Sequence, residues 1–249
     1  MVRAFVIGQS HTSCITQAQK DDPALMPDIV VLRLRGSKGS PADGVTIEQA
    51  FEEVACCQAD PPVFLSILGT FHNIYGLLKH DIPFDFLWDK GDALNQLEAQ
   101  LVPTRAMKQL FESKLENAFG LTRLQESTKG KVYLLSSPPP KQSTEFMMRF
   151  VEKRPEKIYH GRRMLDCGFN PPELRQKLWR LECSINQEWA EKRGMTFVPP
   201  PPAAFDEDGF LAIELYASDV THANASFGKL VLNQIQHILE TTDEACPHD

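Results

Sequence analysis

Short apolar runs alternate along this chain with longer segments whose apolar residues recur at helical spacing. The runs, each of which predicts a short strand, are residues 3–8, 28–34, 61–68, 131–135 and 195–198. Strands that alternate with helices are typical of a parallel sheet with helices on both faces. The pattern therefore predicts an α/β fold, a three-layer α/β/α sandwich around a central parallel sheet of about five strands.

The helices are predicted from the remaining periodic segments. They are expected from the turn at Ser10 to about residue 22, over residues 46–58, 103–125 and 171–192, between residues 141 and 152, and after residue 222. Thr46 and Gln49 have the spacing of a capping box. Residues 69–103 show no single period but hold five aromatic side chains, so we expect an insertion or lid-like segment around residues 70–102 that covers or lines a site.

Composition narrows the functional classes. With 249 residues and 42% hydrophobic content the chain can bury one large core, and we expect a single domain over residues 1–249. The net charge of −7 is spread without a basic stripe, which argues against nucleic acid and anionic membranes as partners and favours a small, neutral or weakly charged substrate. No apolar run resembles a signal peptide or a membrane span, so a cytoplasmic location is expected.

The six cysteines are scattered, and no CxxC pair occurs among them. In a chain with an ample core they are expected to be reduced thiols, and no zinc-ligand pattern is present. We therefore predict neither a metal nor another cofactor.

Several polar or small residues fall at predicted strand ends. Ser10, Gly36, Gly69, Ser137 and the loop around Asp219 each lie at or shortly after one. Ligands of parallel α/β sheets bind beside the carboxyl ends of the strands. This coincidence predicts an active site at that edge.

Ser10, Asp219 and His222 could form a nucleophile, an orienting acid and a base. A serine hydroxyl attacks only when an imidazole takes its proton, and the imidazole needs a partner that holds its tautomer. Two structural alternatives remain open: Asp219 or Thr221 could merely cap the last helix, and Ser10 could cap the first. The first helix start could also bind an anion, although no phosphate-loop motif supports it.

These pieces occur in the order of the SGNH (GDSL-like) hydrolase family. Gly8-Gln9-Ser10 resembles its first block, usually Gly-Asp-Ser, and Gly36 falls where its second-block glycine follows strand two. The segment 68–73 resembles its third block, and Asp219-Val220-Thr221-His222 its last, Asp-x-x-His. The resemblance spans nearly the whole chain.

The resemblance implies a flavodoxin-like fold, an acyl-enzyme on Ser10 and an oxyanion hole. The donors it implies are the backbone N–H groups of Ser10 and Gly36 and an Asn amide near Gly69. The sequence departs from the family here, because the asparagine is delayed to Asn73; either Asn73 serves or His72 donates in part. The second-block glycine could also be Gly39 or Gly44.

We therefore expect a serine esterase acting on a small acyl ester, with an O-acetyl group on a carbohydrate as one candidate. Catalytic residues would be Ser10, Asp219 and His222, and His11 and His72 are candidate substrate-binding residues, although a polar residue such as His11 early in a helix is often only solvated. Two alternatives stay open: an O-acyltransferase with the same triad, and a non-catalytic binding protein with a decayed hydrolase fold. Cys14, one helical turn from Ser10, is expected to serve packing.

Overall fold

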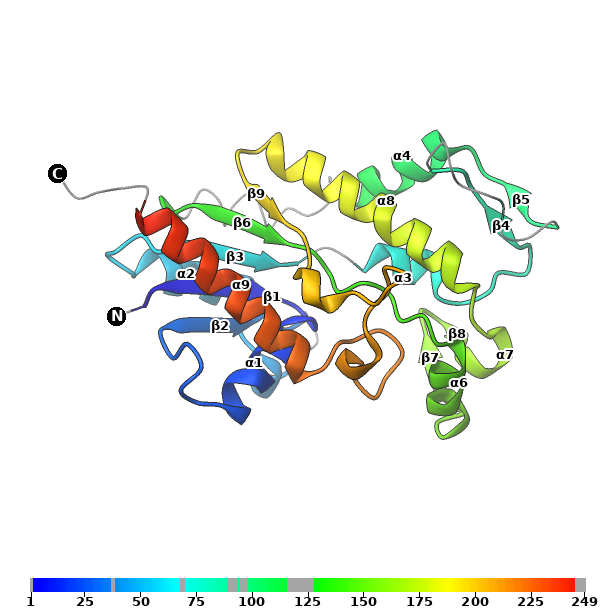
Figure 1. Cartoon of the computed structure of the whole chain (residues 1–249), viewed down its shortest axis with the longest axis horizontal. Helices are drawn as coiled ribbons and strands as arrows, with labels where there is room; N and C mark the ends of the chain where they lie inside the picture. Colours follow the sequence, from blue (N-terminus) through cyan, green and yellow to red (C-terminus); the bar gives the residue numbers. More distant parts are fainter. Residues whose placement is uncertain are drawn as a thin grey trace.

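A parallel sheet of five strands forms the centre of the molecule (Figure 1). The computed structural model describes residues 2–36, 39–67, 70–88, 94, 98–115 and 128–244. In spatial order the strands are β2 (Ile29–Arg33), β1 (Ala4–Gly8), β3 (Val63–Ser66), β6 (Val132–Leu135) and β9 (Thr196–Val198). Every neighbouring pair is parallel. The predicted α/β sandwich with a five-stranded parallel sheet is confirmed.

Helices cover both faces of this sheet. On one face lie α1 (Thr12–Asp21) and α9 (Ala225–Glu244), and on the other α2 (Ile47–Ala55), α4 (Thr104–Leu115) and α8 (Pro172–Glu191). The shorter elements are α3 (Phe71–Gly76), α6 (Thr144–Glu152), α7 (Met164–Cys167), the strand pairs β4 (Phe84–Asp85) with β5 (Gln100–Leu101) and β7 (Ile158–Tyr159) with β8 (Arg162–Arg163), and 3₁₀ turns at Pro41–Asp43, Pro202–Ala204 and Ile213–Leu215.

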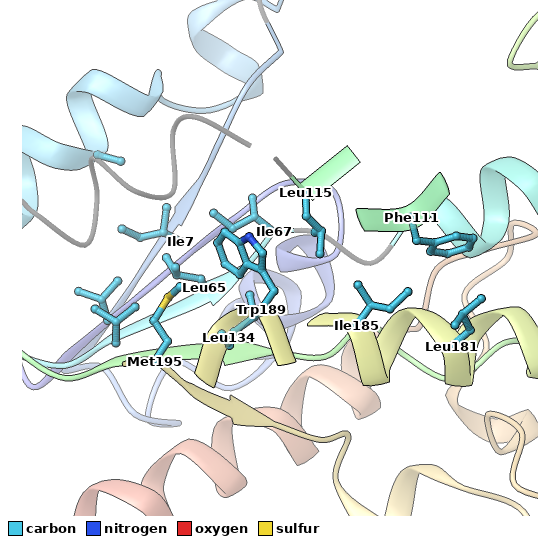
Figure 2. Packing of buried hydrophobic residues seen from close by; sticks show 14 of the residues in the cluster. Ile7, Leu65, Ile67, Phe111, Leu115, Leu134, Leu181, Ile185, Trp189 and Met195 are labelled. Atoms are coloured by element: carbon cyan, nitrogen blue, oxygen red, sulfur yellow. The ribbon is translucent and has the colours of Figure 1, made fainter. Parts of the chain in front are cut away.

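Side-chain alternation along the strands divides the core into two layers. Phe5 and Ile7 of β1 pack under α2, α4 and α8, whereas Ala4 and Val6 pack under α1 and α9. A strand that is buried on both faces in this way reads as a continuous apolar run rather than as an alternating one. Figure 2 shows part of the first layer, in which Ile7, Leu65 and Leu134 lie close to Trp189 and Met195.

The start of α2 and the extent of α4 bear on two of the local predictions. The capping box at the start of α2 is present, with Gln49 N donating to Thr46 Oγ1 at 3.2 Å and Thr46 N donating to Gln49 Oε1 at 2.9 Å. The helix expected over 103–125 is described as far as Leu115, and the remainder of that prediction lies outside the described residues. Across the described ranges, no helix has the length and apolar character needed to cross a bilayer.

The aromatic segment 70–102 contains α3 and the β4–β5 pair. Phe86 is fully buried, and Phe71, Tyr75 and Trp88 pack against the same core layer as α8. These aromatic side chains thus belong at least in part to the core.

Candidate active site

Ser10 lies in a sharp turn between β1 and α1, at the carboxyl edge of the sheet. A Cβ on Gly8, the last residue of β1, would come within 2.3 Å of the backbone oxygen of Ser66 on β3, so glycine is required where the two strands meet. His11, not Ser10, occupies the N-cap position of α1, and it makes no side-chain capping bond. Within the described chain neither the hydroxyl nor the backbone N–H of Ser10 donates a hydrogen bond. The helix-capping role considered for Ser10 is therefore wrong.

Asp219 and His222 form a hydrogen-bonded pair in the loop before α9. His222 Nδ1 lies 2.7 Å from Asp219 Oδ2, while the other carboxylate oxygen accepts the backbone N–H groups of His222 and Thr221 at 2.8 and 2.9 Å. Partial burial of Asp219 raises its pKa, but the hydrogen bonds and charge of His222 outweigh this, and the pKa stays well below its ordinary value. A carboxylate on Nδ1 leaves Nε2 free to accept a proton.

Capping of α9 is not what this pair does. The N-cap is Asn224, whose Oδ1 accepts from the backbone N–H groups of Ser226 and Phe227 at 2.9 and 3.3 Å. The proposed alternative that Asp219 or Thr221 caps the last helix is therefore wrong. Because Asn224 caps α9, the Asp219 carboxylate is available to bind His222.

Lys141 holds the Asp219 loop in place through hydrogen bonds to its backbone. Its ammonium group is buried and donates to the backbone oxygens of Ala217 and Asp219 at 2.7 and 2.5 Å. Burial lowers the pKa of Lys141 to about 8, with the Asp219 charge acting in the opposite direction. Tyr216 also anchors the loop, because its hydroxyl accepts the backbone N–H of Gln142 at 2.8 Å.

Ser10, Asp219 and His222 line one open cleft of about 540 Å³. Close packing of α9 on α1 helps to bring them together, since a Cβ on Gly228 would lie 2.1 Å from the backbone oxygen of Cys14. The side chain of His222 is 32% exposed, so its free edge can be reached from the cleft. No hydrogen bond joins Ser10 to His222 in the described conformation, and such bonds often tighten only when substrate is bound.

His11 lies beside His222 but is buried, not solvated. The two ring centroids are 5.3 Å apart, His11 is 9% exposed, and neither of its ring nitrogens has a partner among the described residues. Burial first, and then the charges of His222 and His72, lower the pKa of His11 to about 3, although Asp219 raises it. Its imidazole is therefore neutral at physiological pH.

The thiol of Cys14, one turn into α1, donates to the backbone oxygen of His11 at 2.9 Å. Burial raises the pKa of this thiol to about 12. The prediction that Cys14 serves packing is confirmed.

A second carboxylate–imidazole pair, His72 with Glu182, lies at the start of α3. His72 Nδ1 is 2.5 Å from Glu182 Oε2, and both side chains are 2% exposed. Glu182, which belongs to α8, also accepts the backbone N–H groups of Phe71 and His72 at 3.0 and 3.3 Å. One buried carboxylate thus fixes the first turn of α3 and the orientation of the His72 ring.

The predicted oxyanion-hole residues differ in burial and in hydrogen bonding. Asn73 is buried next to His72, and its side-chain amide makes no hydrogen bond within the described part of the chain. Gly36 is exposed in open space, while Gly39 N donates to the Gly36 oxygen at 2.8 Å and is engaged. Gly69 lies outside the described residues. The backbone N–H groups of Ser10 and Gly36 and the side-chain amide of Asn73 thus donate no hydrogen bond among the described residues.

Lys141, Glu182 and Tyr216 were not singled out from the sequence. In the sequence, Glu182 is 110 residues from His72 and Lys141 is 78 residues from Asp219. A polar residue on an apolar helix face, such as Glu182 between Leu181 and Ile185, is the signal that could have found one of them.

No family model matches the chain, and no curated protein matches its sequence. Its structure is similar to that of a GDSL-like lipase from Bacteroides thetaiotaomicron (15% identity, TM-score 0.48), covering 97% of this chain and 89% of the other. It is also similar to the periplasmic domain of a Salmonella ser. Paratyphi A lipopolysaccharide acetyltransferase (12% identity, TM-score 0.48), covering 96% of this chain and 84% of the other. A third similar structure is the C-terminal catalytic domain of Streptococcus pneumoniae peptidoglycan O-acetyltransferase A (11% identity, TM-score 0.42), covering 97% of this chain and 94% of the other.

Proposed function

We propose that the protein is a serine esterase that cleaves a small acyl ester through an acyl-enzyme on Ser10. An O-acetyl group on a carbohydrate is the candidate substrate. The observation that carries the proposal is the Asp219–His222 pair, whose imidazole is oriented by a carboxylate and shares an open cleft with Ser10. A nucleophile, a base and the group that orients the base are the minimum that acyl transfer requires.

In the first half of the reaction, Ser10 Oγ attacks the carbonyl carbon while His222 Nε2 takes the hydroxyl proton. The tetrahedral intermediate then collapses, and the leaving alcohol oxygen takes that proton from His222. In the second half, water attacks the acyl-enzyme and gives its proton to His222; collapse returns a proton to Ser10 Oγ and releases the acid. Asp219 remains ionised throughout, consistent with its low pKa.

Negative charge on the carbonyl oxygen would be stabilised by the free N–H of Ser10 and by the Asn73 amide. Neither donor makes a hydrogen bond within the described residues, so both are free to bind an oxyanion. Removal of one such donor typically lowers kcat by about 10²–10³-fold.

The test is the mass of the intact protein after incubation with a fluorophosphonate. We expect one adduct on the wild type and none on Ser10→Ala, with circular dichroism showing that both are folded. Ser13→Ala is a matched control, because Ser13 lines the same cleft from within α1 and should leave the adduct intact. An unlabelled, folded wild type would refute the esterase and favour a binding protein.

If Ser10 is labelled, an acceptor alcohol distinguishes hydrolysis from transfer. With an acetyl ester as donor, a hydrolase should release acetate at a rate that excess sugar hardly changes. A rise in acetylated sugar at the expense of acetate would assign acyl transfer to the same triad.

A further inference from the structure

A second hollow adjoins the catalytic cleft. It has a volume of about 520 Å³ and is lined by Phe146, Arg149, Phe150, Lys153, Arg154, Tyr216 and Ser218. Tyr216 and Ser218 also line the cleft that holds Ser10 and His222. The two hollows therefore share part of their wall. We call the second one the α6 groove, because α6 and the two residues that follow it supply most of its lining.

Three cations gather in the α6 groove although the chain as a whole carries a net charge of −7. Arg149 is paired with Glu145 one helical turn away. Lys153 and Arg154, at the end of α6, pair with no carboxylate among the described residues. The groove thus presents positive charge that the protein itself leaves largely uncompensated.

Three aromatic side chains, Phe146, Phe150 and Tyr216, also line the groove. Phe146 and Tyr216 meet edge to face with ring centroids 5.1 Å apart, and the buried Lys141 ammonium lies 5.0 Å from each ring. The guanidinium of Arg154 lies over Phe150 at 4.7 Å from its centroid. Flat apolar surface beside a cation suits a ring that bears a negative substituent.

Helix α6, which lines the groove, packs against the loop that carries Asp219 and His222. Val220, between Asp219 and His222, is buried in one apolar cluster with Met147 and Val151 of α6. A ligand bound on α6 is therefore bound to an element that packs against the loop of the base, and such a contact can orient a reacting ester.

We propose that the α6 groove binds the part of the ester substrate that carries a negative charge next to a ring, such as an acidic sugar or a carboxylated aromatic ring. The proposal rests on the proposed esterase function. It revises the expectation of a neutral substrate that was drawn from overall charge, because three cationic side chains line this groove in a chain whose net charge is −7. Charge on the substrate then selects it and steers it toward Ser10.

The test compares two acetyl esters that differ by one carboxylate: phenyl acetate and 4-acetoxybenzoate. Binding is measured by titration calorimetry on Ser10→Ala, which cannot form the acyl-enzyme. We expect 4-acetoxybenzoate to bind at least ~10-fold more tightly at low salt, with a smaller preference at 0.5 M salt because surface charges are then screened. Adding Arg149→Gln, Lys153→Gln and Arg154→Gln should abolish the preference.

A matched control removes the same charge elsewhere. Lys20, Lys129 and Lys131 are exposed. Lys20 lies at the end of α1, and the other two lie just before β6. All three are therefore at the amino edge of the sheet, opposite the cleft. Changing all three to Gln on the Ser10→Ala background should keep the preference. Lys153→Gln alone, at an exposed position, is the second variant if the triple groove variant melts early, and it should lower the preference in part.

Equal dissociation constants for the two esters, or a preference that survives in the groove variants, would overturn the proposal. Turnover by the wild type is a separate readout that tests the esterase function. Binding preference without turnover of either ester would sustain the groove and refute the esterase. Turnover of both esters without a binding preference would sustain the esterase and refute the groove.

Discussion

Burial of a neutral His11 makes the stability of the fold depend on pH. In an unfolded chain a histidine has a pKa of 6.5, whereas burial, reinforced by the charges of His222 and His72, lowers that of His11 to about 3 in the folded protein. Below pH 6.5 the unfolded chain therefore binds a proton that the folded chain does not. The stability contributed by the neutral ring is fully present above pH 6.5 and is lost as the pH falls toward 3.

The magnitude follows from linkage. Each pH unit well below 6.5 costs about 1.4 kcal/mol, so the free energy of unfolding should fall by about 2 kcal/mol between pH 7 and pH 5 on account of His11 alone. Carboxylates titrate mainly below this window, because their ordinary pKa values lie near 4. The window therefore isolates the histidines.

Urea unfolding followed by tryptophan fluorescence at pH 7, 6, 5.5 and 5 measures the effect. We expect His11→Leu, which keeps a similar volume but cannot bind a proton, to lose about 2 kcal/mol less than the wild type over this range. His237→Gln is the control, since His237 is exposed on α9 and its removal should leave the pH dependence unchanged. Equal pH dependence of wild type and His11→Leu would refute the reasoning.

Three further substitutions probe the supports of the site. Gly228→Val should destabilise the fold by about 1–3 kcal/mol, seen in urea unfolding, because its Cβ would overlap the Cys14 backbone; an unchanged midpoint would contradict this packing. Lys141→Met should slow fluorophosphonate labelling at least ~10-fold, since the carbonyl of Asp219 loses its donor; a wild-type labelling rate would argue against that support. Glu182→Gln should lower the stability by about 1–3 kcal/mol, whereas the exposed change Glu145→Gln should not.

The sheet could be predicted from the sequence because its strands are buried on both faces. A run such as Ala4–Gly8 is then continuously apolar and stands out from the amphipathic helices on either side. The same reasoning gave little for residues 69–103 and 154–170, where strands of two residues and a helix of four carry too few positions to show a period.

The site was predictable only as far as its chemistry is local. Asp219 and His222 are three residues apart, and a single turn brings them together, so the pair could be predicted from their spacing. Glu182 and Lys141 act across long separations, and only the packing of α8 and of the segment after β6 places them at the site. Likewise, no local pattern predicts that the ring of His11 is buried beside that of His222.

Two carboxylate–imidazole pairs occur among the described residues, and their surroundings decide which histidine can serve as the base. In both pairs the carboxylate binds Nδ1 and also accepts the backbone N–H of the same histidine. His222 is 32% exposed and lines the cleft with Ser10, whereas His72 is 2% exposed and held against α8. A base in hydrolysis must reach both the serine hydroxyl and an incoming water, and only His222 lies on the cleft wall. Under the proposed function, in which Asn73 donates to the oxyanion, loss of the Glu182–His72 contact should weaken oxyanion binding and leave the proton transfer to His222 in place.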